Sequence, residues 1–371
     1  MRYEVGDLPV QTLLPAIGRA EDHLARLDEV VRRSPVGEGF VERGHFFDAA
    51  ASMWIAGELV HVEDLVLHDA HMDVRAPTHE LTISHAILRA RRRIADAEPA
   101  WAVSGPGLST LAGLRGAADL TAGNDHGPGD DGGGDVFADG EEAWSAEFAA
   151  IDAVLERSRR LLEGEEAPAI HTEKPQSVIV GGLVVRDAEW DERGRIEQWQ
   201  AVVREVEDLP PTLAAVVLWD AWETLEPLQN KHWLGPLLVG AWLRSRRKVT
   251  SHLFCLNVGL KTIPRERRRS RSKTTRLLAA LDAMSAAGEA GMKEIARLAQ
   301  AREQMARRLN GRRSSSRLPT AIELVLSRPI VSAAMIAKTA KVTPRGALNL
   351  IGELGVREVT GRGRYRAWGI L

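Results

Sequence analysis

Two short amphipathic segments near the C-terminus, joined by a tight turn at 340–342, constrain the fold of this chain more than any other feature. Ser332 is suited to cap the first helix and Thr343 the second, because their hydroxyls can accept backbone N–H bonds. Pro344 then occupies the first helical position, which tolerates proline, and Gly355 is placed to end that helix. Two short helices connected in this way form the helix-turn-helix pattern.

The residues around this pattern predict a small complete domain. The segment "TAIELVLSRP" is typical of a helix that Pro329 ends, and "VREVTGRGRYRAWGIL" is typical of a hairpin with glycines and arginines at its tip. A helix-turn-helix followed by a basic hairpin predicts a winged helix over residues 319–371. The predicted buried faces of the two short helices are Ile336, Ala337 and Ala340 in the first, and Leu348, Ile351 and Leu354 in the second.

Exposed polar residues of the second helix predict a DNA-reading surface. Arg345 and Asn349 are four residues apart and therefore lie on one helix face. Arginine can bond guanine, and asparagine adenine, through two hydrogen bonds each, so these are the predicted base readers. The predicted partner is double-stranded DNA bound by a homodimer, and the alternative is a winged helix used only for protein contacts. The predicted DNA-binding residues are Ser332, Lys341, Thr343, Pro344, Arg345, Asn349, Arg362, Arg364 and Arg366.

The charge distribution also indicates a basic, polyanion-facing end. Residues 241–371 hold 28 Lys and Arg against 8 Asp and Glu, a balance of +20, whereas residues 1–240 have a balance of −22. The alternative is a solvated basic surface that pairs with the acidic part of the chain. Within the basic part, "PRERRRSRSKTTR" at 264–276 could follow a nucleic-acid backbone or serve as a solvated connector. It has no interleaved aromatic residue, which argues against stacking on single-stranded bases.

The rest of the chain predicts a mainly α-helical protein. Apolar residues recur every three to four positions in several segments. Gly288 and Gly291 are predicted to divide the long helical stretch that follows residue 276 into two helices. The segment 177–199 alternates in polarity and predicts a small β-hairpin with its turn at Glu192–Gly194. The main predicted helices cover residues 12–33, 45–67, 78–96, 141–163, 212–225 and 234–245.

Composition predicts two flexible linkers. Residues 122–140 are rich in Gly and Asp, and residues 310–319 contain a run of Ser and Arg. Neither segment has enough apolar residues to pack against a core. The predicted organisation is an N-terminal helical region at 1–121, a linker at 122–140, a helical core at 141–310, a linker at 311–318 and a winged helix-turn-helix domain at 319–371.

Several classes of protein do not fit this sequence. No run of about 18 uncharged apolar residues is present, and "MRYEVGDLPV" lacks the features of a secretory signal. A single cysteine, Cys255, excludes an internal disulfide and a multi-cysteine zinc site. We therefore expect a cytoplasmic protein without a cofactor or a metal. The minor alternative is a metal site on a helical stripe, whose residues are His61, Asp64, His68 and His71.

Two segments of the body resemble Fic-type enzymes, which transfer AMP from ATP to a target hydroxyl. The stretch "FFDAAASMWIAGELVHVEDL" at 46–65 is similar to the N-terminal Fic motif. The stretch "LPPTLAAVVLWDAWETLEPLQNKHWLGPLLVGAWL" at 209–243 is similar to the Fic core. The resemblance implies a Fic-like helical body, and a C-terminal winged helix is common in that family. It also implies a motif His as general base, a Gly-Asn-Gly turn and an Arg that bind phosphates, and an acidic residue for magnesium.

The residues of the Fic motif are largely replaced. Glu226 stands where the family has its catalytic His, and "QNKHWLGP" after it has neither the Gly-Asn-Gly turn nor the Arg. His232 lies too far along the chain to replace the base. Ser52 is kept, but the inhibitory Glu of the family falls on Ala56. The body is therefore predicted to be a degenerate Fic-like domain with no catalytic residue, and the protein is predicted not to be an enzyme.

The whole chain resembles a family of uncharacterised, often plasmid-borne proteins of rhizobia, which pair a domain of unknown function with a C-terminal helix-turn-helix. The signatures "SRPIVSAAMIAKTAKVTP" and "TGRGRYRAWGI" carry this resemblance. The predicted function is DNA binding by a transcriptional regulator, whose inactive body supplies dimerisation or sensing. The alternatives are an active AMP transferase with Glu226 as its base, and a protein-interaction module in a plasmid stability or defence system.

Overall fold

A computed structural model describes residues 3–6, 8–73, 76–114, 190–308, 317–360 and 366–370 of the protein. Helices dominate these residues, as the sequence predicts, and the strands among them all lie in the C-terminal domain. The helices of the body are α1 (Val10–Arg33), α2 (Gly37–Ala56), α3 (Val62–Asp69), α4 (His79–Asp96), the 3₁₀ helix η1 (Trp101–Val103), α5 (Gly105–Ala112), α7 (Glu192–Glu205), α8 (Pro211–Leu225), α9 (Leu234–Ser245), α10 (Leu256–Leu260), α11 (Arg265–Arg268) and α12 (Lys273–Arg307). The C-terminal domain contains α13 (Leu318–Ser327), β1 (Val331–Ser332), α14 (Ala333–Ala340), α15 (Pro344–Leu354), β2 (Arg357–Glu358) and β3 (Ala367–Gly369).

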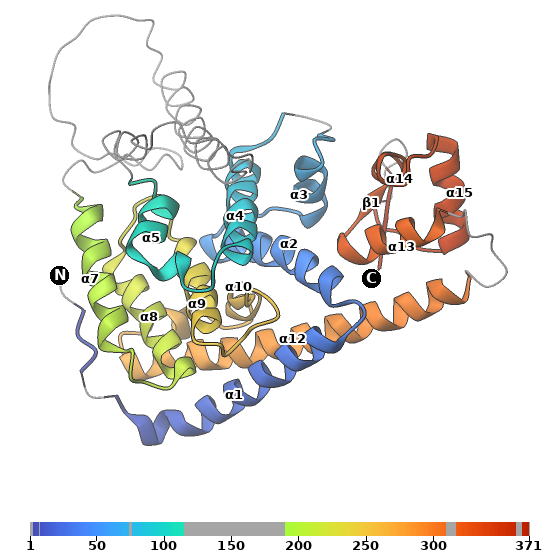
Figure 1. The fold of residues 1–371 in the computed structure, drawn as a ribbon. Coiled ribbons are helices and arrows are strands. Elements are labelled where there is room, and N and C mark those ends of the chain that lie inside the picture. Colours follow the sequence, from blue (N-terminus) through green and yellow to red (C-terminus); the bar gives the residue numbers. More distant parts are fainter. Residues whose placement is uncertain are drawn as a thin grey trace, which may run out of the picture.

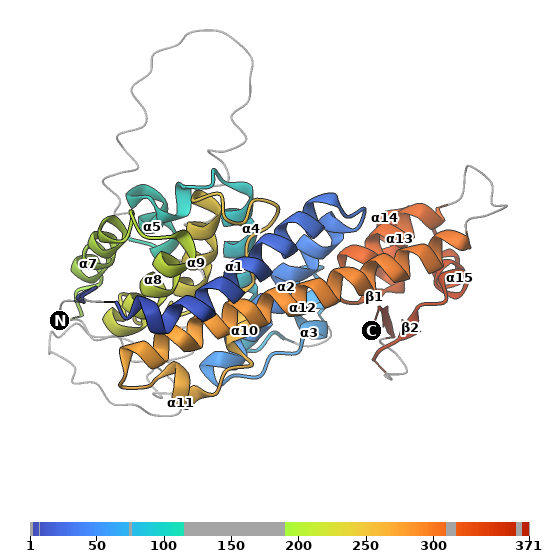
Figure 2. The same cartoon turned by 90° about the horizontal axis from the view of Figure 1, so that it is seen from below.

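Helices α1 and α12 run side by side along one flank of the body in both views (Figures 1 and 2). Helix α10 packs against α12 and α2, and α8 packs against α9 and α12, so the body is built around α12. None of the helices within the described residues is both long and apolar enough to cross a membrane. The face of α1 that is buried has the three- and four-residue spacing of an amphipathic helix, with Leu13, Ala16, Ile17, Ala20, Leu24, Leu27 and Val31.

The long helical stretch is one helix, not the two that Gly288 and Gly291 predict. Helix α12 continues without a break for 35 residues. A Cβ atom at Gly288 would lie 2.8 Å from the Cβ of His23, and one at Gly291 would lie 2.7 Å from the Cδ2 of Leu27. Because glycine has no side chain, these two positions allow α1 to approach α12 closely. They serve helix packing and do not end the helix.

Replacing Gly288 by Ala should destabilise the protein, whereas the same replacement of Gly18 should stabilise it. Both residues lie inside helices, where Ala is favoured over Gly by roughly 0.5–1 kcal/mol. Among the described residues, nothing lies within 4 Å of a Cβ at Gly18, so this gain should appear in full. At Gly288 the contact with His23 should outweigh the gain and leave a net loss of about 1–2 kcal/mol. Urea denaturation of both variants measures the difference, and equal effects at the two sites would contradict the packing role.

The predicted helix 45–67 consists of two helices, α2 and α3. Gly57 has a left-handed backbone conformation with φ 96°, which ends α2. The N–H groups of Gly57 and Glu58 bond back to the carbonyls of Trp54 and Met53, so the last turn of the helix is completed. Apolar residues continue into α3 after this break, so the apolar pattern alone predicts one helix where the structure has two.

The hairpin turn predicted at Glu192–Gly194 is wrong, because α7 begins at Glu192. The side chain of Asp191 accepts a hydrogen bond from the N–H of Gly194 (2.8 Å) and caps the helix. Gly194 thus lies in the first turn of a helix and not in a hairpin. The remaining predictions for this region lie outside the described residues, namely those for 122–140, 141–163, 177–189 and most of the linker at 311–318.

A buried ion pair joins three helices inside the body. The carboxylate of Asp48 and the guanidinium of Arg91 are bonded to each other, and both residues are 0% exposed. Asp48 also accepts hydrogen bonds from the side chain of Asn257 (3.0 Å) and the N–H of Val258 (3.2 Å). Arg91 donates a further hydrogen bond to the carbonyl of Leu253 (3.0 Å). The pair therefore links α2, α4 and α10 at one point in the core.

Candidate nucleic-acid interface

The elements of the C-terminal domain follow the order helix, strand, helix, helix, strand, strand. Its strands form one antiparallel sheet in the order β1-β3-β2. In this sheet Trp368 of β3 lies opposite Val331 of β1 and Glu358 of β2. This is the arrangement of a winged helix, as the sequence predicts, and its first helix already begins at Leu318.

The turn between α14 and α15 has the predicted caps. Lys341 is exposed and ends α14 in a left-handed conformation with φ 52°. The hydroxyl of Thr343 accepts a hydrogen bond from the N–H of Gly346 (3.1 Å), and Pro344 is the first residue of α15. Gly355, with φ 61°, ends that helix. The hydroxyl of Thr343 is therefore used within the turn, and the two helices have the connection of a helix-turn-helix.

The buried stripe of α15 differs from the predicted stripe at one position. Ile351 and Leu354 are buried as predicted, but Leu348 is 46% exposed. Ala347 is buried in its place. Residues 347, 351 and 354 lie on one helix face, and the contacts of α15 with α13 and α14 bury this face and leave Leu348 outside it.

The exposed residues Arg345, Leu348, Asn349 and Gly352 form one row along α15, which we call the recognition face. The row presents a guanidinium, an aliphatic side chain and an amide next to one another. A Cβ atom at Gly352 would meet nothing within 4 Å among the described residues. Helix α15 also lies at the end of the molecule opposite α7 in both views (Figures 1 and 2). The structure therefore brings the two predicted base readers together on an open surface.

The structure describes one of the three arginines predicted for the basic hairpin, or wing, that contains β2 and β3. Arg366 is exposed, and its guanidinium bonds to the carboxylate of Glu358 on the neighbouring strand (2.5 and 2.9 Å). The hydrogen bond from Arg366 lowers the pKa of Glu358, so this carboxylate stays charged and partly neutralises the arginine. The predicted residues Arg362 and Arg364 lie outside the described residues.

Ser332 lies between the C-terminal domain and the body. Its hydroxyl accepts a hydrogen bond from the N–H of Met335 (3.2 Å) and lies 3.6 Å from the sulfur of Met72. The structure thus places this predicted DNA-binding residue at a helix cap. Two exposed cations, Lys338 of α14 and Arg357 of β2, are absent from the predicted set. Their position beside the recognition helix was the signal that could have identified them.

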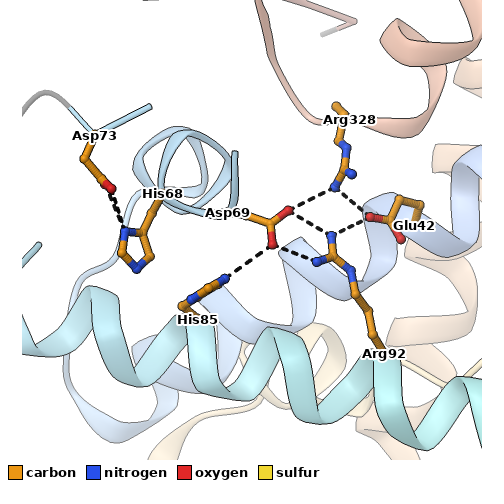
Figure 3. A network of polar contacts seen from close by, with 7 residues as sticks. All are labelled: Glu42, His68, Asp69, Asp73, His85, Arg92 and Arg328. Atoms are coloured by element: carbon orange, nitrogen blue, oxygen red, sulfur yellow. Dashed lines mark hydrogen bonds and ion pairs between the residues drawn. The ribbon is translucent and has the colours of Figure 1, made fainter. Parts of the chain in front are cut away.

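A network of ion pairs attaches the C-terminal domain to the body (Figure 3). Arg328, which follows α13, bonds to Glu42 of α2 (2.6 Å) and to Asp69 of α3 (3.3 Å). Arg92 of α4 bonds to the same two carboxylates at 2.6 and 2.7 Å. Burial raises the pKa of Asp69, but its hydrogen bonds with His85 and Arg92 outweigh this effect and hold the pKa below its usual range. The carboxylate therefore stays charged, and together with Glu42 it joins α2, α3 and α4 of the body to the domain.

Close backbone contacts support the same attachment. Arg43 is buried, donates a hydrogen bond to the carbonyl of Arg328 (2.5 Å) and pairs with Glu294 of α12 (2.8 Å). A Cβ atom at Gly39 would lie 2.9 Å from the carbonyl oxygen of Leu326, so α2 and α13 are in direct contact. The recognition face is consequently carried by a domain that several contacts hold against the body.

His68 of α3 and His85 of α4 each bond to an aspartate. His68 bonds to Asp73 (2.9 Å) and packs edge-on against His85, with ring centroids 4.7 Å apart. In the part of the chain that the structure describes, no group of three or more His, Cys, Asp or Glu side chains is arranged to hold a metal ion. The alternative of a metal site at this stripe therefore has no geometric support there.

Two family models match the chain. Residues 318–371 match "HTH DNA binding domain", and residues 184–310 match "Protein of unknown function (DUF1612)". The protein therefore combines a DUF1612 domain with a C-terminal helix-turn-helix domain of the DNA-binding class. The sequence is also 46% identical over 389 residues to the uncharacterized protein y4cF of Sinorhizobium fredii (strain NBRC 101917 / NGR234), with 100% of both chains covered. The chain belongs to the same family as that rhizobial protein.

These matches test the two family resemblances of the sequence, to uncharacterised rhizobial proteins and to Fic-type enzymes. The predicted pairing of a domain of unknown function with a C-terminal helix-turn-helix is confirmed. The match over the body is to a domain of unknown function, so a Fic-like fold for the body stays a prediction.

Proposed function

We propose that this protein binds specific sites in double-stranded DNA through α15 and acts as a transcriptional regulator. The observation that carries the proposal is the recognition face, where Arg345, Leu348 and Asn349 are exposed together on a helix with a cap at each end. The match of residues 318–371 to a helix-turn-helix DNA-binding domain supports it. Contacts with base edges specify the sequence, whereas contacts with phosphates position the protein, so two sets of residues have separate roles.

In this proposal the N-terminal half of α15 enters the major groove of DNA. Arg345 lies in the first turn and is suited to guanine, and Asn349 lies one turn further along and is suited to adenine. Leu348 lies between them and offers an apolar surface to a thymine methyl group. The phosphates on either side of the groove then face exposed cations of the same domain, which are Lys338, Lys341 and Arg357.

Replacing Glu358 by Ala should strengthen binding to non-specific DNA. The carboxylate of Glu358 bonds to Arg366 and partly neutralises it, so its removal releases a cation for phosphate contact. The affinity for a non-specific duplex should rise by roughly threefold or more at low salt, with a steeper dependence on salt concentration. Titration of a labelled duplex at two salt concentrations measures both quantities. Glu323 of α13, an exposed glutamate of the same domain, provides the matched control, and an unchanged salt slope in Glu358→Ala would contradict the assignment.

The body is proposed to supply dimerisation or sensing. One winged helix reaches few base pairs, so a homodimer on an inverted repeat gives the specificity that a regulator needs. The ion pairs of Arg328 hold the domain against the body, so in such a dimer they would help to fix the distance between the two recognition helices. The half-sites should then be separated by about one helical turn of DNA or a multiple of it.

We infer that the body does not transfer AMP. Glu226, at the position of the Fic base, is exposed and ends α8 in a left-handed conformation with φ 44°. General-base catalysis and phosphate positioning each contribute on the order of a hundredfold or more, so their joint loss should abolish turnover. A radiolabelled transfer assay with ATP and magnesium should therefore detect no product. This inference would be overturned if the wild-type protein transferred the label and the Glu226→Ala variant did not.

Selection of bound fragments from genomic DNA tests the proposed function most directly. Full-length protein should retain a small set of fragments that share an inverted repeat, and it should bind a synthetic copy of that repeat more tightly than a scrambled duplex. The advantage over the scrambled duplex should persist at physiological salt, because base contacts contribute to it in addition to phosphate contacts. No retention of DNA, together with salt-independent binding to a protein partner, would instead favour a protein-interaction module.

A further inference from the structure

A cavity of about 410 Å³ lies between the C-terminal end of α2 and the segment that joins α10 to α11. Pockets for small molecules have volumes of roughly 300–1,000 Å³, so this cavity is large enough for a ligand of that kind. Helix α11 packs beside the N-terminal part of α12, whereas α15 lies beyond the other end of α12 (Figures 1 and 2). A helix as long as α12 spans about 50 Å, so the cavity is separate from the recognition face.

The cavity has a cationic wall and an apolar wall. Basic side chains from both sides of Pro264 form the first, and side chains from the end of α2 contribute to the second. Among the described residues, no carboxylate belongs to the lining. We call the basic lining residues Lys261, Arg265, Arg268 and Arg269 the cationic wall, and the lining residues Trp54 and Ile263 the apolar wall.

The cationic wall contains two guanidinium groups that bond to no other described side chain or backbone group. Arg265 and Arg269 are exposed, and the guanidinium group of neither makes a hydrogen bond or ion pair with another described residue. By contrast, Arg267 of the same tract bonds to Asp282 of α12 (2.8 Å). Glu223 of α8 faces Arg269 and Arg268, and burial raises the pKa of its carboxyl. The tract at 264–276 is therefore folded, and two of its cations remain available at the cavity.

We propose that this cavity binds a small phosphorylated molecule with a flat ring, of the nucleotide class. Its phosphate oxygens accept charge-assisted hydrogen bonds from Arg265 and Arg269, since a planar guanidinium matches the geometry of a phosphate. Its ring packs against Trp54, a residue that is 43% exposed. The ammonium group of Lys261 lies 5.5 Å from the centroid of this indole ring, in a cation–π contact. The segment 226–235 that resembles the Fic motif is not part of this lining, and the inference does not depend on DNA binding.

Isothermal calorimetry on the full chain tests this site with three probes, which are ADP, inorganic pyrophosphate and adenosine. ADP should bind most tightly, because it alone uses both walls. The double variant Arg265→Ala, Arg269→Ala should weaken ADP and pyrophosphate binding by about tenfold or more. Trp54→Ala should weaken ADP binding and leave pyrophosphate binding unchanged. Arg271→Ala is the matched control, since Arg271 is an exposed arginine of the same tract outside the lining, and it should bind all three probes as the wild type does.

All the substituted residues are exposed, and circular dichroism should report an unchanged fold. The absence of heat with ADP and pyrophosphate in the wild type would overturn the proposal. Equal ADP affinity in the wild type and the double variant would overturn it as well. A double variant that loses affinity for duplex DNA, in a protein that shows no ADP binding, would assign these arginines to the DNA backbone instead.

Discussion

Replacing Asp48 by Ala should destabilise the body by about 3–5 kcal/mol, because it leaves the guanidinium of Arg91 buried without its partner. Both residues are 0% exposed, so water cannot replace the lost carboxylate. The hydrogen bonds of Asp48 with Asn257 and Val258 are lost as well, and α10 then loses a connection to α2. Chemical denaturation should therefore show a much lower midpoint for Asp48→Ala than for the wild type.

The ion pair between Asp22 and Arg26 on the surface of α1 provides the matched control. Its atoms are 2.8 Å apart, but the two side chains are 47% and 65% exposed. Exposed pairs within a helix contribute only about 0.3–0.5 kcal/mol, so Asp22→Ala should change the midpoint very little. Similar losses in Asp22→Ala and Asp48→Ala would mean that burial of the Asp48–Arg91 pair has no special consequence, which would contradict the role assigned to it.

Replacing Arg345 or Asn349 by Ala should cost about 1–3 kcal/mol of binding free energy at the selected DNA site. Each variant should also relax the preference at one base pair, because each side chain is assigned to one base. The affinity of Asn349→Ala for non-specific DNA should remain that of the wild type, since a neutral amide contributes little to phosphate binding. Leu348→Ala should reduce the preference for thymine at the base pair between those contacted by Arg345 and Asn349. Titration against the selected site and its single-base variants measures these effects.

Two further variants separate base reading from charge. Arg357→Ala removes an exposed cation of the wing and should weaken specific and non-specific binding alike. The slope of the logarithm of the binding constant against the logarithm of the salt concentration should decrease in magnitude by about one. Arg193→Ala removes an exposed arginine of α7, at the opposite end of the molecule, and should change neither. Wild-type affinity in both Arg345→Ala and Asn349→Ala would refute the recognition face and favour a winged helix used for protein contacts.

The helix-turn-helix could be predicted because its signals are local. Thr343, Pro344 and Gly355 each act within one or two turns of their own helix, through a hydroxyl, a ring and a left-handed backbone conformation. The same locality explains the error at Leu348. Apolar spacing predicts a stripe, but neighbouring stripes that include 347 or 348 fit the pattern almost equally well. Contact of α15 with α13 and α14 decided between them.

The body was harder to predict because its contacts join distant parts of the chain. Gly288 and Gly291 suggest a helix break when they are read alone, and they become packing positions only because α1 lies against them. The cavity at Trp54 and Arg265 also unites two segments far apart in the sequence. For the tract at 264–276, the sequence left open whether its charges are solvated or bound, and the answer differs from one arginine to the next.

The sequence by itself determined the mainly helical fold, the caps of the recognition helix and the residues that its exposed face could use. Only the tertiary structure decided that α12 is continuous, that Leu348 joins Arg345 and Asn349 on the recognition face, and that Arg366 is bonded to Glu358. The physical reason is one of range. Caps and helix periodicity depend on backbone groups a few residues away, whereas burial and ion pairing depend on which other elements approach a side chain in space.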